Sequence, residues 1–227
     1  MPRNRSFSRP SGAGSCVLVS GGVESAALLG RAAAGREAVY PVYVRGGHAW
    51  ERAELHWLRR LCRAIRSPRL KPLSVLDLPV RDCYRSARWS LSGRRAPSAR
   101  TPDEAVYLPG RNLLLLAKVS VFCAERGIRR IALGSLGSNP FPDGRRAFFR
   151  RMAAAASMGL GTRLEVEAPF GRSRKPQVLR RLPSLPWGLT FSCIAPRGLR
   201  HCGRCNKCAE RRAAFREAGL ADPTPYG

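Results

Sequence analysis

The feature that most constrains the fold is a glycine turn between an apolar strand and a helix. Ser20-Gly21-Gly22-Val23-Glu24-Ser25 follows the apolar run 16–19 and precedes the helix-forming run 26–29. The two glycines permit a positive φ and leave no side chain between the peptide N–H groups and a ligand. Because the first amides of a helix lack intrahelical partners, the turn predicts a phosphate or pyrophosphate site. The hexapeptide alone leaves open an ordinary turn without a ligand.

Other phosphate-binding loops are excluded by the sequence. Neither G-x-x-x-x-G-K-[ST] nor G-x-G-x-x-G occurs, and the turn contains no lysine. Ser20 and Ser25 add hydroxyl donors. The turn resembles the S-G-G-x-D-S loop of the PP-loop ATP pyrophosphatases, with Glu24 where that family usually has aspartate.

The length and composition indicate one globular domain with a good core. The chain has 227 residues, 44% of them hydrophobic, and its apolar run 113–117 ends at Lys118, far short of a membrane span. The formal charge of +26 would suit an RNA partner. Lysine accounts for only four of the 41 basic residues, however, so arginine enrichment from a GC-rich genome is an equal explanation. A nucleic-acid partner is therefore only weakly supported.

Strands and helices alternate along the chain. Hydrophobic patterns predict strands near 16–19, 38–44, 73–78, 131–133 and 164–166, and helices over 51–65, 112–126, 147–158 and 176–182. The helix 112–126 is apolar almost all round and is expected in the interior. Such alternation predicts an α/β fold, with a parallel sheet covered by helices on both faces.

The expected domain organisation rests on changes in composition, on the PP-loop resemblance and on a cysteine cluster near the C-terminus. Residues 1–14 read as a basic, disordered leader, 15–187 as an ATP-binding α/β domain, and 188–227 as a zinc-binding C-terminal element packed on it. Within the domain, 81–105 loses its periodicity and becomes rich in Arg, Ser and Pro. We expect a flexible flap on the substrate side there, with a disordered insertion as the alternative.

Four of the eight cysteines gather near the C-terminus, which is the strongest local signal. Their pattern, Cys193-x8-Cys202-x2-Cys205-x2-Cys208, predicts a closed four-thiolate site for structural zinc, in a protein of the reducing cytoplasm. An iron–sulfur cluster is the competing prediction, because it also takes four thiolates. His201 is an alternative ligand, less favoured than the four cysteines. A closed site leaves no position for water, so the metal is expected to brace the chain rather than catalyse.

Three further segments carry side chains suited to anions or a purine-like ring. Arg111 and Asn112 follow Gly110 at a helix entry, where Arg111 suits phosphate and Asn112 suits an N-cap. Lys175 precedes a helix and could reach a nucleotide phosphate. After the strand 131–133, a loop at the carboxyl edge of the sheet carries a candidate substrate set. That set comprises Phe141 for stacking, Asp143 for a purine-like N–H edge, and Arg145.

In this order the segments resemble one family, 7-cyano-7-deazaguanine synthase, a PP-loop enzyme family of queuosine precursor synthesis. The resemblance spans about 15–226, and the segments that carry it are 20–25, 108–113, 141–145, Lys175, 193–211 and 218–226. It implies an adenine-nucleotide α-hydrolase-like sheet with a zinc-bound C-terminal element. It also implies that ATP with Mg²⁺ adenylates 7-carboxy-7-deazaguanine, and that ammonia converts the adenylate to an amide and then a nitrile.

The resemblance also implies residue roles. Nucleotide binding would fall to Ser20, Gly21, Gly22, Val23, Glu24, Ser25, Gly110, Arg111 and Asn112. Catalysis would fall to Ser20, Ser25, Arg111 and Lys175, and substrate binding to Phe141, Asp143 and Arg145. Free ammonia is the expected nitrogen source, because the length leaves no room for a glutaminase domain. A cytoplasmic homodimer is expected.

The chain departs from the family pattern near the substrate, which keeps two other hypotheses open. Glu24 is one methylene longer than aspartate, the loop 134–143 is short and carries Ser138-Asn139 where acids are common, and the flap is arginine-rich. A divergent relative, within a defence system, could ligate the activated deazaguanine to a protein or other macromolecular amine. A basic, zinc-containing RNA-binding protein with a decayed ATP loop is the third hypothesis.

Overall fold

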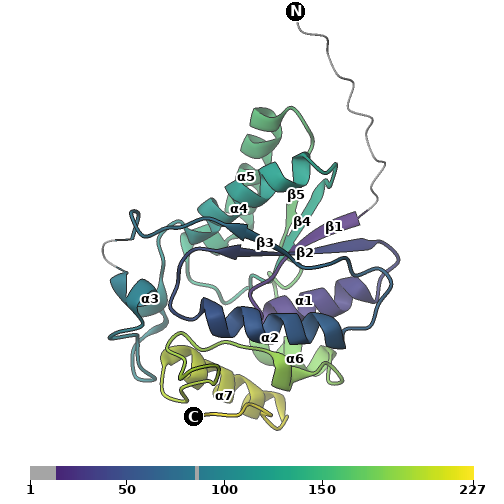
Figure 1. The fold of residues 1–227 in the computed structure, drawn as a ribbon. Helices are drawn as coiled ribbons and strands as arrows, with labels where there is room; N and C mark the ends of the chain where they lie inside the picture. Colours follow the sequence, from purple (N-terminus) through teal and green to yellow (C-terminus); the bar gives the residue numbers. More distant parts are fainter. Residues whose placement is uncertain (1–13, 85–86) are drawn as a thin grey trace, which may run out of the picture.

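A five-stranded parallel sheet is the framework of the molecule. The computed structural model describes residues 14–84 and 87–227. The strand order is β3-β2-β1-β4-β5, and every neighbouring pair is parallel, which confirms the predicted α/β fold (Figure 1). The strands are β1 (Gly14–Leu18), β2 (Ala38–Arg45), β3 (Ser74–Asp77), β4 (Arg130–Leu133) and β5 (Glu165–Glu167).

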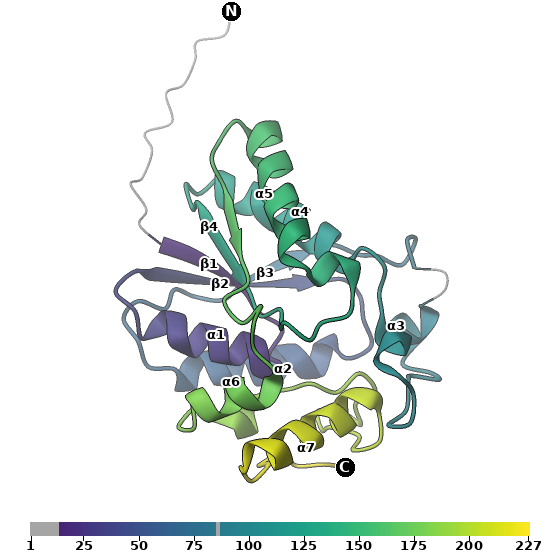
Figure 2. The ribbon, with the colours of Figure 1, turned by 180° about the vertical axis from the view of Figure 1, so that it is seen from behind.

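Helices cover both faces of this sheet. Helices α1 (Val23–Ala33) and α2 (Glu51–Ala64) lie on one face, with α6 (Lys175–Arg181) and α7 (Asn206–Ala218) as an outer layer (Figures 1 and 2). Helices α4 (Arg111–Ala124) and α5 (Arg146–Leu160) cover the opposite face (Figure 2). Within the described residues, three short 3-10 turns lie in the connections: η1 (Asp103–Val106), η2 (Pro142–Gly144) and η3 (Trp187–Leu189). Among the described helices, each falls short of the length and apolarity that crossing a bilayer requires.

The central strand explains why the sheet has two cores. Val17 of β1 packs with α1 and α2 residues, whereas Cys16 and Leu18 pack with residues of α4 and α5. All three side chains are buried. A parallel strand covered on both faces needs apolar residues at consecutive positions, which is why 16–19 reads as an unbroken apolar run.

Helix α4 corrects the sequence interpretation. It was predicted to lie in the interior, but Leu113 and Val121 are 47% and 50% exposed, while Leu116, Val119 and Cys123 face the sheet. One face of this helix therefore covers the β-sheet and the other meets solvent. A surface helix usually has a polar outer face, whereas the outer face of α4 carries apolar residues such as Leu113 and Val121.

The irregular segment 81–105 packs against the C-terminal element. It contains a short helix that the sequence pattern missed, α3 (Arg88–Ser92), and Ser90 is fully buried. The Asn206 N–H donates to the Pro97 carbonyl at 2.9 Å, and the Ala99 N–H donates to the Arg204 carbonyl at 2.9 Å. The described part of the expected flap is thus hydrogen-bonded to the chain around the cysteine cluster. Residues 1–13 of the expected leader lie outside the described residues, and its last residue, Gly14, begins β1.

Candidate functional site

The glycine turn joins the carboxyl end of β1 to the start of α1. Gly21 has a φ of +80°, a conformation that L side chains rarely adopt, and Gly22 is the N-cap of α1. The Ser25 hydroxyl donates to the Gly22 carbonyl at 3.1 Å and accepts from the Ser20 N–H at 3.2 Å. The two serine hydroxyls are 3.3 Å apart. The turn therefore brings two hydroxyls close to the N-terminus of α1, an arrangement that suits an anion.

Six of the sequence-predicted residues line one cavity beside this turn. The cavity has a volume of about 360 Å³ and is lined by Ser20, Gly22, Glu24, Arg111, Phe141 and Lys175. A neighbouring hollow of about 200 Å³ shares Ser20, Glu24 and Arg111 and also contacts Ser25 and Asn112. Residues separated by up to 155 positions thus meet where the carboxyl ends of β1 and β4 lie. Ligands of open parallel sheets bind at this edge.

Lys175 is held between two carboxylates at the edge of the cavity. Its Nζ lies 2.9 Å from Glu24 Oε1 and 2.7 Å from Glu210 Oε1. Lys207 Nζ lies 2.6 Å from Glu210 Oε2. Burial disfavours the lysine charge, but the two carboxylates outweigh it and raise the pKa of Lys175 above its ordinary value. Its side chain is 11% exposed, so the ammonium is a fixed charge inside the site rather than a solvated one.

Arg111 begins α4, but the helix is capped differently from the sequence prediction. Gly110, with a φ of +69°, occupies the N-cap position that we expected for Asn112. The Asn112 N–H donates instead to Asp143 Oδ2 at 2.8 Å, and the Asn112 amide donates to the Asp143 carbonyl at 3.0 Å. Asp143 is buried, at 7% exposed. Its carboxylate accepts a hydrogen bond from the first turn of α4, and its carbonyl ties the loop after β4 to the same helix.

The other two substrate candidates lie in different environments. Phe141 lines the cavity and stacks on Tyr107, with ring centroids 4.7 Å apart and an interplanar angle of 21°. Arg145 is the exposed N-cap of α5, outside the set of residues that line the cavity. Of the predicted substrate set, Phe141 thus faces the cavity while Asp143 supports its wall.

The cavity also contains a buried acid that sequence reasoning missed. Glu54 of α2 lines it, and the Tyr43 hydroxyl donates to Glu54 Oε2 at 2.7 Å. Burial raises the pKa of Glu54 to about 8, although Arg111 and the Tyr43 hydrogen bond favour its charged form. The signal in the sequence was an acid on the apolar face of an amphipathic helix, beside Leu55 and Leu58.

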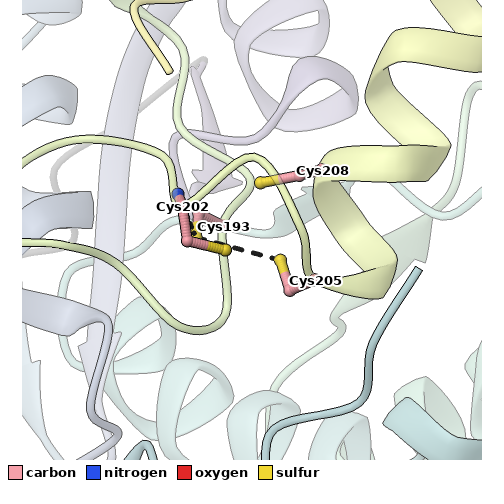
Figure 3. Close-up of side chains that lie close together, drawn as sticks. All are labelled: Cys193, Cys202, Cys205 and Cys208. Atoms are coloured by element: carbon pink, nitrogen blue, oxygen red, sulfur yellow. Dashed lines mark hydrogen bonds between the residues drawn. The ribbon is translucent and has the colours of Figure 1, made fainter. Parts of the chain in front are cut away.

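The four predicted metal-binding cysteines come together before and within the first turn of α7. The sulfur atoms of Cys193, Cys202, Cys205 and Cys208 all lie within 4.8 Å of one another and are buried, and Figure 3 shows the side chains converging. The Sγ atoms of Cys193 and Cys205 are 3.8 Å apart. The Ala195 and Cys202 N–H groups point at Cys193 Sγ from 3.4 and 3.3 Å. Four buried sulfurs this close together, one of them receiving two backbone N–H groups, fit a thiolate-bound metal.

His201 is outside this cluster. Its Nε2 accepts a hydrogen bond from the Ser192 N–H at 3.1 Å, and its ring packs against Phe191 and Tyr226. Burial lowers the pKa of His201 to about 4, so the ring is a neutral acceptor at physiological pH.

The C-terminal element also contacts the glycine turn directly. The Phe191 N–H donates to the Gly21 carbonyl at 2.7 Å, two residues before Cys193. Phe191 is fully buried and lines the cavity. The chain that carries the cysteines therefore forms one wall of the site.

Comparisons with known proteins show the family of this chain. Residues 14–219 match the model of the family described as queuosine biosynthesis protein QueC. The chain belongs to this family. A 7-cyano-7-deazaguanine synthase from Caldicellulosiruptor bescii is 30% identical over 228 residues, covering 92% of this chain and 96% of the relative. The synthase from Anaeromyxobacter dehalogenans is 32% identical over 222 residues, covering 92% and 94%.

Among solved structures, the U34-tRNA thiolase NcsA from Methanococcus maripaludis has a TM-score of 0.45 and 10% identity. The alignment covers 96% of this chain and 75% of that chain. The family match spans the glycine turn, the α4 entry, Lys175 and the four cysteines. The residues matched by the family model thus include those that line the cavity and the four cysteines.

Proposed function

We propose that the chain is an ATP-dependent ligase that makes 7-cyano-7-deazaguanine. ATP adenylates the carboxylate of 7-carboxy-7-deazaguanine, and ammonia displaces AMP to give the amide. A second activation, on the amide oxygen, is followed by loss of AMP and formation of the nitrile. The names of the curated relatives, aligned over 92% of the chain, support this substrate class.

The observation that carries the proposal is the convergence on one cavity of the glycine turn, Arg111 and Lys175. Both reactants are anions, and a turn of N–H and hydroxyl donors with two cations beside it stabilises the charge that builds on leaving pyrophosphate. The volume of about 360 Å³ falls within the range of small-molecule sites. The protein's contribution is mainly to position the two reactants, because adenylation asks little covalent chemistry of it.

Magnesium and zinc have separate places in this proposal. Glu24 is the turn's carboxylate and offers the oxygen ligand that Mg²⁺ prefers, and Mg²⁺ would neutralise phosphate charge when bound. For the cysteines, a Zn–S bond of about 2.3 Å implies a tetrahedral S···S edge of about 3.8 Å. The Cys193–Cys205 separation of 3.8 Å matches that edge, and all four sulfurs lie within 4.8 Å of one another. This supports a single zinc ion over a [4Fe–4S] cluster, in which each thiolate binds a different iron atom.

Mass spectrometry of products tests the proposal. Purified protein is incubated with ATP, magnesium, ammonium and 7-carboxy-7-deazaguanine, and we expect the nitrile, AMP and pyrophosphate. Lys175→Met should reduce the rate by at least about a hundredfold, because it removes a cation from the phosphate site. Lys118→Met, which changes an exposed lysine of α4, is the matched control and should retain the wild-type rate.

The other outcomes distinguish the remaining hypotheses. An adenylate or amide without nitrile would replace the synthase with a ligase that passes the activated carboxylate to a macromolecular amine. No release of AMP or pyrophosphate would overturn both enzymatic proposals for this substrate.

A further inference from the structure

The ion pairs of Lys175 join three elements that are distant in sequence. Lys175 begins α6, Glu24 lies in the first turn of α1, and Glu210 lies in the second turn of α7. The Lys175 ammonium contacts Glu24 at 2.9 Å and Glu210 at 2.7 Å. The family resemblance accounts for the lysine and for the acid in the turn. Glu210 lies within the segment 193–211 that carries the resemblance, but the resemblance assigns it no role.

Glu210 is itself held in one orientation. Its Oε1 contacts Lys175 and its Oε2 contacts Lys207, so both carboxylate oxygens are paired. A lysine side chain has substantial rotamer freedom. With Glu24 as its single partner, the ammonium would move whenever the Glu24 side chain moves. A second carboxylate on another helix fixes the ammonium between the two.

We propose that Glu210 is a positioning residue of the ATP site, which holds the Lys175 ammonium beside the glycine turn for the leaving pyrophosphate. This inference rests on the proposed ATP-dependent function. Glu210 acts through Lys175 and has no direct part in the bond changes. Its carboxylate also lines the cavity, so its negative charge opposes the binding of phosphate while it aligns the lysine.

The position of Glu210 depends on the cysteine cluster. Cys205 is the N-cap of α7, Cys208 lies in its first turn, and Glu210 follows two residues later on the same helix. The C-terminal element therefore places a charge in the ATP site as well as covering it. The two functions of this element, metal binding and alignment of Lys175, share one short helix.

The kinetic test compares Glu210→Gln with Glu217→Gln. Glu217 is also on α7 and pairs with Arg174, the residue before Lys175, at 3.0 Å, but that pair is exposed and lies outside the set of cavity residues. We expect Glu210→Gln to lower kcat by about tenfold to a hundredfold through misplacement of Lys175. KM for ATP should stay the same or fall, because a charge that repels phosphate is removed.

The control and the conservative variant make this test specific. Glu217→Gln should match the wild type in both constants, and Glu210→Asp should recover part of kcat because it keeps the charge. A raised KM with unchanged kcat, or equal effects of Glu210→Gln and Glu217→Gln, would overturn the inference.

A second readout is independent of the reaction. Trace acetylation of the four lysines, followed by peptide mass spectrometry, measures how much neutral amine each one offers, with exposed Lys71 and Lys118 as internal references. Loss of Glu210 removes a charge that stabilises the Lys175 ammonium, so Lys175 should be acetylated several-fold faster in Glu210→Gln than in wild type or Glu217→Gln. Unchanged references show that the reagent acts equally on both proteins, and an unchanged Tm shows that the variant is folded.

The two readouts separate the inference from the proposed function. If wild-type protein turns over no ATP but Glu210→Gln speeds acetylation of Lys175, the proposed function fails and the contact stands. If turnover occurs and neither kcat nor acetylation of Lys175 changes, the positioning role of Glu210 is wrong.

Discussion

Glu54 illustrates how burial changes the chemistry of a single residue. It is 7% exposed, contacts the Tyr43 hydroxyl at 2.7 Å and has a pKa of about 8, against an ordinary value near 4.5. At neutral pH a protonated carboxyl therefore lines the cavity, where it can donate a hydrogen bond as well as accept one. Perturbed acids of this kind often lie in functional sites.

This pKa predicts a pH dependence of stability. Because the folded pKa of Glu54 is raised, its contribution to the free energy of unfolding is fully present below about pH 4.5 and is lost as the pH rises through about 8. Glu54→Gln, which cannot ionise, should therefore gain stability relative to wild type across that window. Urea unfolding at a series of pH values measures the difference.

An exposed acid provides the comparison for Glu54. Glu125→Gln changes a glutamate at the end of α4 that faces solvent, and its stability difference from wild type should vary little with pH over the same window. A flat difference for Glu54→Gln as well would contradict the raised pKa.

The junction between β4 and α1 shows a constraint between two elements. A Cβ atom placed on Gly134, just after β4, would lie 2.9 Å from Glu24 Cβ and 2.9 Å from the Ser25 nitrogen. The end of β4 thus packs directly on the first turn of α1, the helix that follows β1. This close approach keeps the glycine turn in place.

Gly134→Ala should therefore displace the first turn of α1. We expect a loss of about 1–3 kcal/mol in the free energy of unfolding, with a raised KM for ATP. Gly159→Ala is the control, because a Cβ there has no heavy atom within 4 Å and the residue lies in α5. That variant should gain up to about 1 kcal/mol. Chemical denaturation and ATP titrations measure both, and a Gly134→Ala protein as stable as wild type would refute the close packing.

At the scale of the whole molecule, the C-terminal element forms a wall of the site and is tied to the rest of the chain. Arg211 of α7 is fully buried and donates to the Trp187 carbonyl, to Thr190 and to Asp222. These hydrogen bonds join α7 to the chain segments before and after it. The same element donates a hydrogen bond from Phe191 to Gly21. Its folding is therefore coupled to the geometry of the glycine turn.

Removal of the metal should destabilise the protein and weaken ATP binding together. A buried four-thiolate site contributes folding energy, so chelation or Cys208→Ser should lower Tm by about 10 °C or more. Cys83→Ser, at an exposed cysteine outside the cluster, should leave Tm and metal content unchanged. Metal analysis, calorimetry and ATP titrations measure the effects. Metal-free protein with an unchanged Tm and ATP affinity would contradict this coupling.

The sequence by itself determined the features that depend on local pattern. The run 16–19 and the alternation of strands and helices predicted the parallel sheet, and the cysteine spacing predicted the cluster at 193–208. The glycine turn was found from Gly21 and Gly22, because positive φ is a local property of the chain. These features are encoded within a few residues and require no knowledge of what packs against them.

Only the tertiary structure decided which side chains face one another. Asp143 caps α4 through Asn112, Glu54 enters the cavity from α2, and Glu210 reaches Lys175 from α7. Each of these contacts joins residues brought together by the strand order and by the docking of α7, which no local periodicity encodes. The prediction that α4 lies in the interior was wrong for the same reason. An apolar helix has the same sequence pattern whether one face or both are covered, and packing against the sheet left Leu113 and Val121 in solvent.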